Sequence, residues 1–207
     1  MSSASSRSDL AALTSAVDEV LAAVRACGRP DAVVLVDGRS GAGKTTLAGM
    51  LKAAWPGSVD VLAMDDVYPG WDGLAAASET LATRILAPRA AGTPGQWERW
   101  DWRRGVPADT ARLRPGRALV VEGDGSLTPA TARFADVTVW LDGPAALRRE
   151  RALARDGETY APHWERWAAQ ERAHIDRHDP RGLAQLVYDA ADPSTASSTA
   201  RTSPSSR

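Results

Sequence analysis

A glycine-rich segment near the N-terminus contains the residue types that bind phosphate. Residues 38–45 read Gly-Arg-Ser-Gly-Ala-Gly-Lys-Thr and satisfy the pattern G-x-x-x-x-G-K-[ST]. In this pattern glycines let backbone N–H groups approach phosphate oxygens, and the lysine and the hydroxyl that follow reach the terminal phosphates and Mg²⁺. A lysine at this position is informative, because the chain contains only Lys44 and Lys52. The pattern predicts an ATP and Mg²⁺ site formed by Gly38, Ser40, Gly41, Ala42, Gly43, Lys44, Thr45 and Thr46.

Acidic residues follow four of the predicted strands: Asp37, Asp65 with Asp66, Glu122, and Asp142. In open α/β sheets ligands bind outside the carboxyl ends of the strands, so these acids share an edge with the glycine-rich loop. A hydroxyl that accepts a phosphoryl group needs a carboxylate beside it to take its proton. We assign this role to Asp65, with Asp66 as the second candidate. Glu122 is assigned to Mg²⁺ together with Thr45, Asp142 to capping the next helix, and Asp37 to touching substrate or bracing the loop.

Arginines recur along a helix predicted over 144–155. Arg148, Arg151 and Arg155 are spaced i, i+3 and i+7, so they share one helix face. Arginines that clamp a phosphoryl group in transit stabilise its charge. We predict that Arg148 and Arg151 act in catalysis and that Arg155 binds the nucleotide. The alternative is a solvent-exposed face in an arginine-rich chain.

Tryptophans gather in the loops predicted near the strand ends. Residues 97–102 read Trp-Glu-Arg-Trp-Asp-Trp, and Trp71 stands in an earlier loop. Such rings can stack on a flat acceptor such as a nucleobase, or they can close a small satellite core. The candidate acceptor contacts are Asp37, Asp66, Tyr68, Trp97, Arg99, Trp100 and Asp101. For the later helix we expect Trp167 and Glu171 to pack and His174 to lie on the surface.

The elements that must position these residues alternate between strands and helices. Apolar, β-branched runs predict strands at 32–36, 59–64, 118–121, 137–141 and 186–188, and apolar residues at helical spacing predict helices at 9–27, 43–55, 74–90, 128–134, 144–155 and 162–177. This alternation predicts an α/β P-loop NTPase fold with about five parallel strands flanked by helices. Residues 92–116 show neither the helical nor the strand pattern and are predicted to be an insertion or lid.

Composition sets the domain organisation and the expected class of protein. The Ser-, Thr-, Ala- and Pro-rich segments 1–8 and 190–207 are predicted to be disordered tails around one domain at 9–189. With 25 Lys and Arg against 26 Asp and Glu, the net charge of −1 argues against a nucleic-acid binder. The chain has one cysteine and no apolar run near the roughly 18 residues of a membrane span. A cytoplasmic protein is expected, and a homodimer is left open.

Several of these motifs together resemble the uridine kinase-like family of nucleoside and pantothenate kinases. Residues 36–48 resemble its P-loop, and Met-Asp-Asp-Val-Tyr at 64–68 resembles its acid-acid-aromatic element, whose first Asp activates the acceptor hydroxyl. Val-Val-Glu-Gly at 120–123 is similar to its magnesium-associated Glu-Gly, and 147–156 to its Arg-rich lid. The resemblance covers about 31–189. The family's nucleoside-recognition segment is absent, and the Trp-rich stretch stands in its place.

The predicted function is transfer of the γ-phosphoryl group of MgATP to a hydroxyl group, with a nucleoside as the expected acceptor. One alternative is a kinase of another small alcohol, such as pantothenate or a sugar. Another is a regulatory P-loop ATPase or interaction module whose Trp-rich segment docks a partner. A Ras-like GTPase is disfavoured, because the chain has no asparagine for the element that reads guanine.

Overall fold

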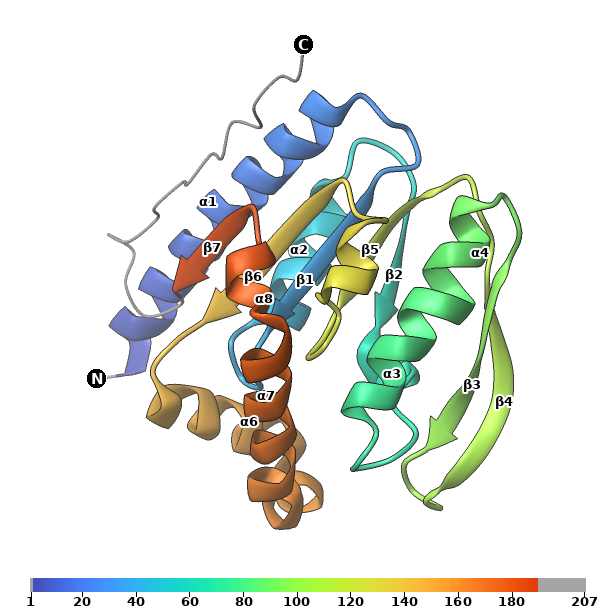
Figure 1. Cartoon of the computed structure of the whole chain (residues 1–207). Helices are drawn as coiled ribbons and strands as arrows, with labels where there is room; N and C mark the ends of the chain where they lie inside the picture. The colour runs from blue at the N-terminus through green and yellow to red at the C-terminus, as the bar shows by residue number, and fades with distance from the viewer. Residues whose placement is uncertain (1, 190–207) are drawn as a thin grey trace.

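A five-stranded parallel sheet forms the centre of the molecule (Figure 1). The computed structural model describes residues 2–189, except the side chains of residues 2–10, 156, 158 and 159, so the tail predicted at 190–207 lies outside the described residues. The strand order is β2-β5-β1-β6-β7, and each neighbouring pair is parallel. The strands are β1 (Val33–Gly38), β2 (Val59–Ala63), β5 (Ala118–Glu122), β6 (Val137–Asp142) and β7 (Leu186–Asp189). The predicted α/β fold with five parallel strands is confirmed.

Helices cover both faces of this sheet. Side chains alternate along a strand, so Leu35 packs into one core while Val34 and Val36 pack into the other. The second core is closed by α1 (Ser2–Cys27) and α2 (Lys44–Ala54). The first is closed by α3 (Leu74–Thr80), which continues through a π-helical segment (Leu81–Leu86) into α4 (Ala87–Ala90), and by α7 (Trp164–His178). The short helices α5 (Pro129–Ala132) and α8 (Pro180–Leu183) complete the core domain.

The first helix is longer than its apolar spacing predicted. It begins at Ser2, not near Asp9, and so includes residues 2–8, for which the composition predicted a disordered tail. Serine and alanine continue a helix at little cost, and this segment contains neither glycine nor proline to end it. In the described residues no helix is both long and apolar enough to cross a membrane.

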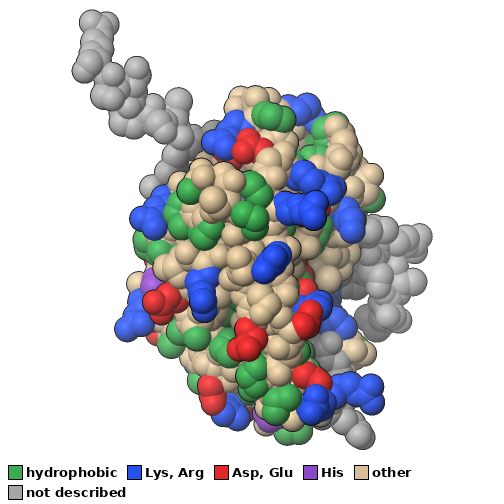
Figure 2. All heavy atoms as spheres, turned by 90° about the vertical axis from the view of Figure 1, so that its right-hand side faces the viewer, with side chains coloured by type: hydrophobic (Ala, Val, Ile, Leu, Met, Phe, Trp, Pro, Cys, Tyr) green, Lys and Arg blue, Asp and Glu red, His purple; other side chains and the backbone are tan. Residues whose placement is uncertain are grey.

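Residues 92–116 form a β-hairpin beside the main sheet. Strands β3 (Gly95–Asp101) and β4 (Val106–Leu113) pair antiparallel, and the buried Trp97 and Leu113 join them to the core. The hairpin was not predicted as strands, because a register shift between Glu98 and Trp100 breaks the alternation of buried and exposed residues. Figure 2 views the molecule from the right-hand side of Figure 1, where the hairpin lies, and shows basic and acidic side chains interspersed on that face.

The arginine-rich helix α6 (Ala145–Tyr160) extends past its predicted end near residue 155. It leaves helical geometry at Gly157, whose φ of 56° and ψ of −138° kink the chain. A short 3₁₀ turn (Ala161–His163) then leads into α7. The kink brings Tyr160 back toward the glycine-rich loop, where its hydroxyl contacts Ser40.

Candidate active site

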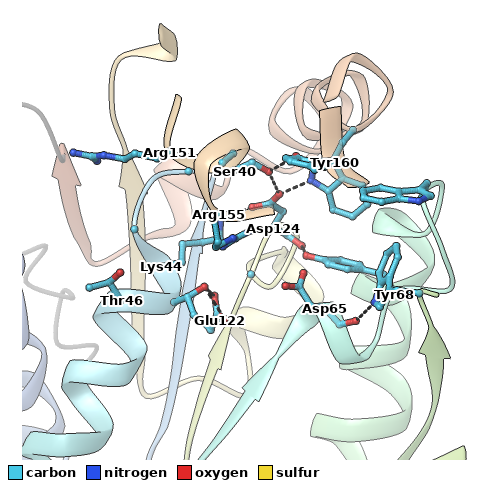
Figure 3. A pocket seen from close by; sticks show the side chains of 18 residues that line it. Ser40, Lys44, Thr46, Asp65, Tyr68, Glu122, Asp124, Arg151, Arg155 and Tyr160 are labelled. Atoms are coloured by element: carbon cyan, nitrogen blue, oxygen red, sulfur yellow. Dashed lines mark hydrogen bonds and ion pairs between the residues drawn. The ribbon is translucent and has the colours of Figure 1, made fainter. Parts of the chain in front are cut away.

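A cavity of about 680 Å³ opens at the carboxyl ends of β1, β2 and β5. One end is formed by the glycine-rich loop and the other by aromatic rings, with carboxylates between them (Figure 3). The residues that line it are Ser40, Gly41, Gly43, Lys44, Thr45, Thr46, Asp65, Tyr68, Trp71, Trp102, Glu122, Gly123, Asp124, Arg151, Ala152, Arg155, Tyr160 and Trp167. The predicted gathering of strand-end acids around the loop is therefore seen for Asp65 and Glu122.

The glycine-rich loop is pressed against neighbouring backbone, which explains its glycines. A Cβ on Gly41, whose φ is +79°, would lie 2.0 Å from the carbonyl oxygen of Arg148. A Cβ on Gly38 would lie 2.1 Å from the carbonyl oxygen of Leu141. Any side chain at either position would displace the loop, so the path of its backbone depends on both glycines.

Lys44 lies at the start of α2 with its ammonium group buried inside the loop. Its Nζ donates to the carbonyl oxygens of Gly38 at 2.7 Å and Arg39 at 3.1 Å and forms a short ion pair with Asp124. Burial by itself would lower the pKa of Lys44, but the Asp124 carboxylate outweighs it and raises that pKa above its ordinary value. The amine is thus held charged at the position where the motif requires a phosphate contact.

Thr45 and Glu122 meet on the floor of the cavity. The Thr45 hydroxyl lies 3.2 and 3.3 Å from the two carboxylate oxygens of Glu122. Burial raises the pKa of Glu122, and the nearby charge of Lys44 opposes this rise. A hydroxyl and a carboxylate oxygen are hard ligands of the kind Mg²⁺ takes alongside phosphate oxygens and water. The pair therefore fits the metal assigned to it.

Asp65 belongs to the 3₁₀ turn (Met64–Asp66) that ends β2, and its carboxylate points into the cavity (Figure 3). Its neighbour Asp66 is exposed and does not line the cavity. Tyr68, two residues further on, lines the cavity with its hydroxyl donating to the carbonyl oxygen of Asp124 at 2.7 Å. The geometry favours Asp65 over Asp66 as the group beside an acceptor hydroxyl, and it corrects the prediction of Asp66 as an acceptor contact.

Arg148 lies behind the glycine-rich loop and outside the cavity, contrary to its predicted catalytic role. Its side chain is 2% exposed, with Nε donating to the Gly143 carbonyl at 2.9 Å and Nη1 to the Ser40 carbonyl at 3.2 Å. Asp142 pairs with this guanidinium at 3.3 Å and does not cap α6. A guanidinium with these partners braces the loop. Arg151 and Arg155, by contrast, line the cavity.

Asp37 is buried behind the loop. For this residue the sequence left two roles open, contact with substrate or support of the loop, and the structure favours support. Its carboxylate accepts hydrogen bonds from the backbone N–H groups of Gly125 at 3.1 Å and Leu127 at 2.8 Å. The same carboxylate lies 3.0 Å from Nε2 of His174. With its oxygens occupied in this way, Asp37 holds the segment after β5 in place, and the predicted acceptor contact is corrected.

Most of the Trp-rich stretch also lies outside the cavity. Trp97 is buried and donates from Nε1 to the Asp66 carbonyl at 2.9 Å, so it anchors the hairpin. Trp100 packs near Gly70 and does not line the cavity. Both were predicted to contact the acceptor. Trp97 is drawn into the core instead, because burying its ring removes much apolar surface from water.

The polar residues between these tryptophans face away from the cavity as well. Arg99 forms an exposed ion pair with Asp109 on the neighbouring strand. The carboxylate of Asp101 accepts backbone N–H groups of Arg103 and Arg104 and closes the hairpin turn. Arg99 and Asp101 are thus both used in contacts within the hairpin. This corrects the prediction that they contact the acceptor. Trp102, in that turn, is the residue of the stretch that reaches the cavity.

Asp124 is the site residue that the sequence interpretation missed. Besides Lys44, it accepts hydrogen bonds from the Ser40 hydroxyl at 2.9 Å and from Nε1 of Trp167 at 2.6 Å. Ser40 in turn accepts a hydrogen bond from Tyr160 at 2.9 Å, as the dashed lines in Figure 3 show. The only sequence signal was an acid directly after the Glu-Gly pair, in a loop that shows neither the helical nor the strand period.

One face of α7 completes the wall behind the loop. Glu171 accepts the backbone N–H of Ser40 at 2.7 Å and pairs with Arg39 at 3.4 Å. Burial and, next, the charge of Asp124 raise the pKa of Glu171 to about 7. Trp167, Glu171 and His174 are spaced i, i+4 and i+7, so this shared face was readable in the sequence. Trp167 and Glu171 are buried as predicted, and in addition both make hydrogen bonds at the site. The predicted surface position of His174 is wrong, because its side chain is buried.

No protein-family model and no curated protein matches the chain. Among solved structures, a possible uridine kinase from Bacillus stearothermophilus aligns with a TM-score of 0.56 at 20% identity, over 77% of this chain and 89% of that one. A candidate fructose transport system kinase from Silicibacter sp. TM1040 aligns with a TM-score of 0.50 at 19% identity, over 85% and 98%. The chain therefore has the fold of the uridine kinase-like P-loop kinases.

Proposed function

We propose that this chain is an ATP-dependent small-molecule kinase that transfers the γ-phosphoryl group of MgATP to a hydroxyl group. The observation that carries the proposal is the single cavity in which the phosphate loop and the carboxylate of Asp65 face the same space. A carboxylate placed there can take a proton from an attacking hydroxyl group. The fold shared with structures described as kinases supports the same reading.

In the proposed mechanism the acceptor hydroxyl lies beside Asp65 and attacks the γ-phosphorus of ATP. A bond forms from the acceptor oxygen to phosphorus, the bond from phosphorus to the β–γ bridging oxygen breaks, and Asp65 takes the hydroxyl proton. Lys44 leaves Asp124 to bind the phosphates, Arg151 stabilises charge on the transferred group, and Arg155 binds the nucleotide. Mg²⁺, held by Thr45 and Glu122, would supply charge neutralisation when bound.

A nucleoside is the acceptor we propose within this class. Support comes from the aromatic end of the cavity, where Tyr68, Trp71, Trp102 and Trp167 offer the apolar faces and edges that a base requires. The competing acceptors are pantothenate and sugars, and the competing function is a regulatory ATPase. ADP release from MgATP, measured with and without nucleosides, pantothenate and sugars, distinguishes a nucleoside kinase from a kinase of another alcohol and from an ATPase. Slow hydrolysis that no acceptor stimulates would contradict the kinase.

Asp65→Asn tests the proposed base. The amide keeps the size of the side chain but cannot take a proton, so turnover should fall by about 10²- to 10⁴-fold while MgATP affinity is retained. Asp66→Asn is the matched control, because that side chain lies outside the cavity, and it should keep near-full turnover. Steady-state kinetics and ATP titration measure both. Near-full activity of Asp65→Asn would refute the assignment.

A further inference from the structure

The turn of the β3–β4 hairpin forms part of the cavity wall directly above Asp65. Trp102 lines the cavity from this turn, and its Nε1 donates to the carbonyl oxygen of Asp65 at 3.1 Å. Its ring meets the ring of Trp71 at a centroid distance of 5.0 Å and an angle of 65°. The hairpin is thereby tied to the residue that we assign as the base, and whatever lies beside Asp65 must also meet Trp102.

The geometry of the rings decides how an acceptor could rest there. A flat group enclosed between two rings needs them about 7 Å apart, twice the usual contact distance of carbon atoms. Trp71 and Trp102 are too close for this, and Trp71 already stacks on His163 at 4.2 Å and 16°. An acceptor would therefore lie against the cavity-facing side of Trp102, in the corner formed with Trp71.

The cationic side chains that line the cavity come from different elements than Asp65 and Trp102. The cations that line the described cavity are Lys44, from the phosphate loop, and Arg151 and Arg155, from α6. The hairpin, the end of β2 and α7 contribute the other side of the lining. The residues on that side include the carboxylate of Asp65 and no cation.

The arginines next in sequence to Trp102 and Trp167 pair elsewhere or lie outside the cavity. Arg166 pairs with Asp72. Arg103 and Arg104, next to Trp102 in the hairpin turn, are exposed and do not line the cavity. At the part of the wall formed by the hairpin, the end of β2 and α7, a carboxylate or phosphate on the acceptor would thus meet the Asp65 carboxylate and no cation, which is unfavourable.

We propose that Trp102 is the acceptor-specificity residue and that the subsite it forms with Asp65 takes hydroxyl compounds without an acidic group and rejects carboxylates and phosphates. This inference rests on the proposed kinase function and narrows its acceptor class. It makes the hairpin, which lies outside the parallel sheet, the element that selects the substrate.

Matched pairs of acceptors test the charge rule. ADP release from MgATP would be measured with uridine against its 5-carboxyl derivative, which keeps every hydroxyl, pantothenol against pantothenate, and glycerol against glycerate. In any pair that is turned over, kcat/KM for the uncharged member should exceed that for its acid by about 100-fold or more. An acid used as well as its uncharged partner would overturn the inference and leave the kinase intact. Stimulation by no compound would overturn the proposed function and the inference together.

Three variants of the hairpin test the role of Trp102. Trp102→Ala should raise the KM of the preferred acceptor about 10-fold, the loss expected for a stacking ring, and leave the KM of ATP within about twofold. Trp100→Ala is the matched control, since that ring belongs to the same hairpin and lies outside the cavity. Trp102→Phe should recover part of the acceptor affinity. Equal effects of both alanine variants, or an equal rise in the two KM values, would overturn the role.

Discussion

At the scale of single residues, Asp124 connects the two ends of the cavity. One of its oxygens pairs with Lys44, and the other accepts hydrogen bonds from Ser40 and Trp167. Burial opposes ionisation of this carboxyl, but the charge of Lys44 prevails, so its pKa is lowered. In the proposed kinase, a nucleotide must therefore replace the Asp124 carboxylate to bind Lys44.

Asp124→Asn tests this exchange of partners. Removing one charge of a buried pair costs about 3–5 kcal/mol, so the melting temperature should fall. MgATP should raise the melting temperature of the variant more than that of the unchanged protein, because phosphate restores a partner that Lys44 now lacks. Thermal unfolding with and without MgATP measures this. Asp142→Asn, which disturbs an ion pair outside the cavity, should show the ordinary MgATP shift, and an ordinary shift in Asp124→Asn would contradict the exchange.

At the scale of elements, helix α7 supports the phosphate loop through one polar face. Glu171 accepts the N–H of Ser40, and His174 pairs with Asp37, which itself holds the loop after β5. The loop is thus positioned by side chains that follow it by more than a hundred residues in the chain. The ionisation of Glu171 links this support to pH.

The free energy of unfolding should depend on Glu171 between about pH 4.5 and 7. Its pKa in the folded protein is raised from the ordinary 4.5 to about 7, so the folded state binds the proton more tightly than the unfolded state. The stabilisation from this proton, on the order of 3 kcal/mol, is present at low pH and is lost as the pH rises to about 7. Glu171→Gln should lack this slope in urea unfolding at pH 5, 6, 7 and 8. Parallel pH curves for the two proteins would contradict the assignment.

At the scale of the whole molecule, the sheet has an apolar core on each face, and the cavity lies at the edge where both cores end. Strand β1 is central, so its side chains enter both cores and its carboxyl end becomes the phosphate loop. Because both cores hold β1 in place, they also hold the loop that follows it. The hairpin is attached to one core alone, through Trp97 and Leu113.

Substitutions in the sheet test the two-sided core. Leu35→Ala, in one core, should lower the free energy of unfolding by about 2–5 kcal/mol, and Val36→Ala, in the other, by about 2 kcal/mol. Val61→Ala, at a position 37% exposed on β2, should cost less than about 0.5 kcal/mol. Urea unfolding measures all three. If either β1 substitution were as mild as Val61→Ala, one face of the sheet would not be packed.

The sequence alone determined the layered fold and the side of the cavity that the glycine-rich loop forms. Strand and helix periods are local properties, so the five strands and the main helices were predictable, and the loop motif carries its chemistry within eight consecutive residues. The positions of Lys44, Thr45, Asp65 and Glu122 follow from strand ends that meet at one edge of the sheet.

Only the tertiary structure decided which polar and aromatic residues face the cavity and which support it. Arg148 and Arg155 share a helix face, yet the first braces the loop and the second lines the cavity. Trp100 and Trp102 are two residues apart, but the register shift and the turn of the hairpin place only Trp102 beside Asp65. Such choices depend on contacts between segments far apart in the chain, which local periods do not encode.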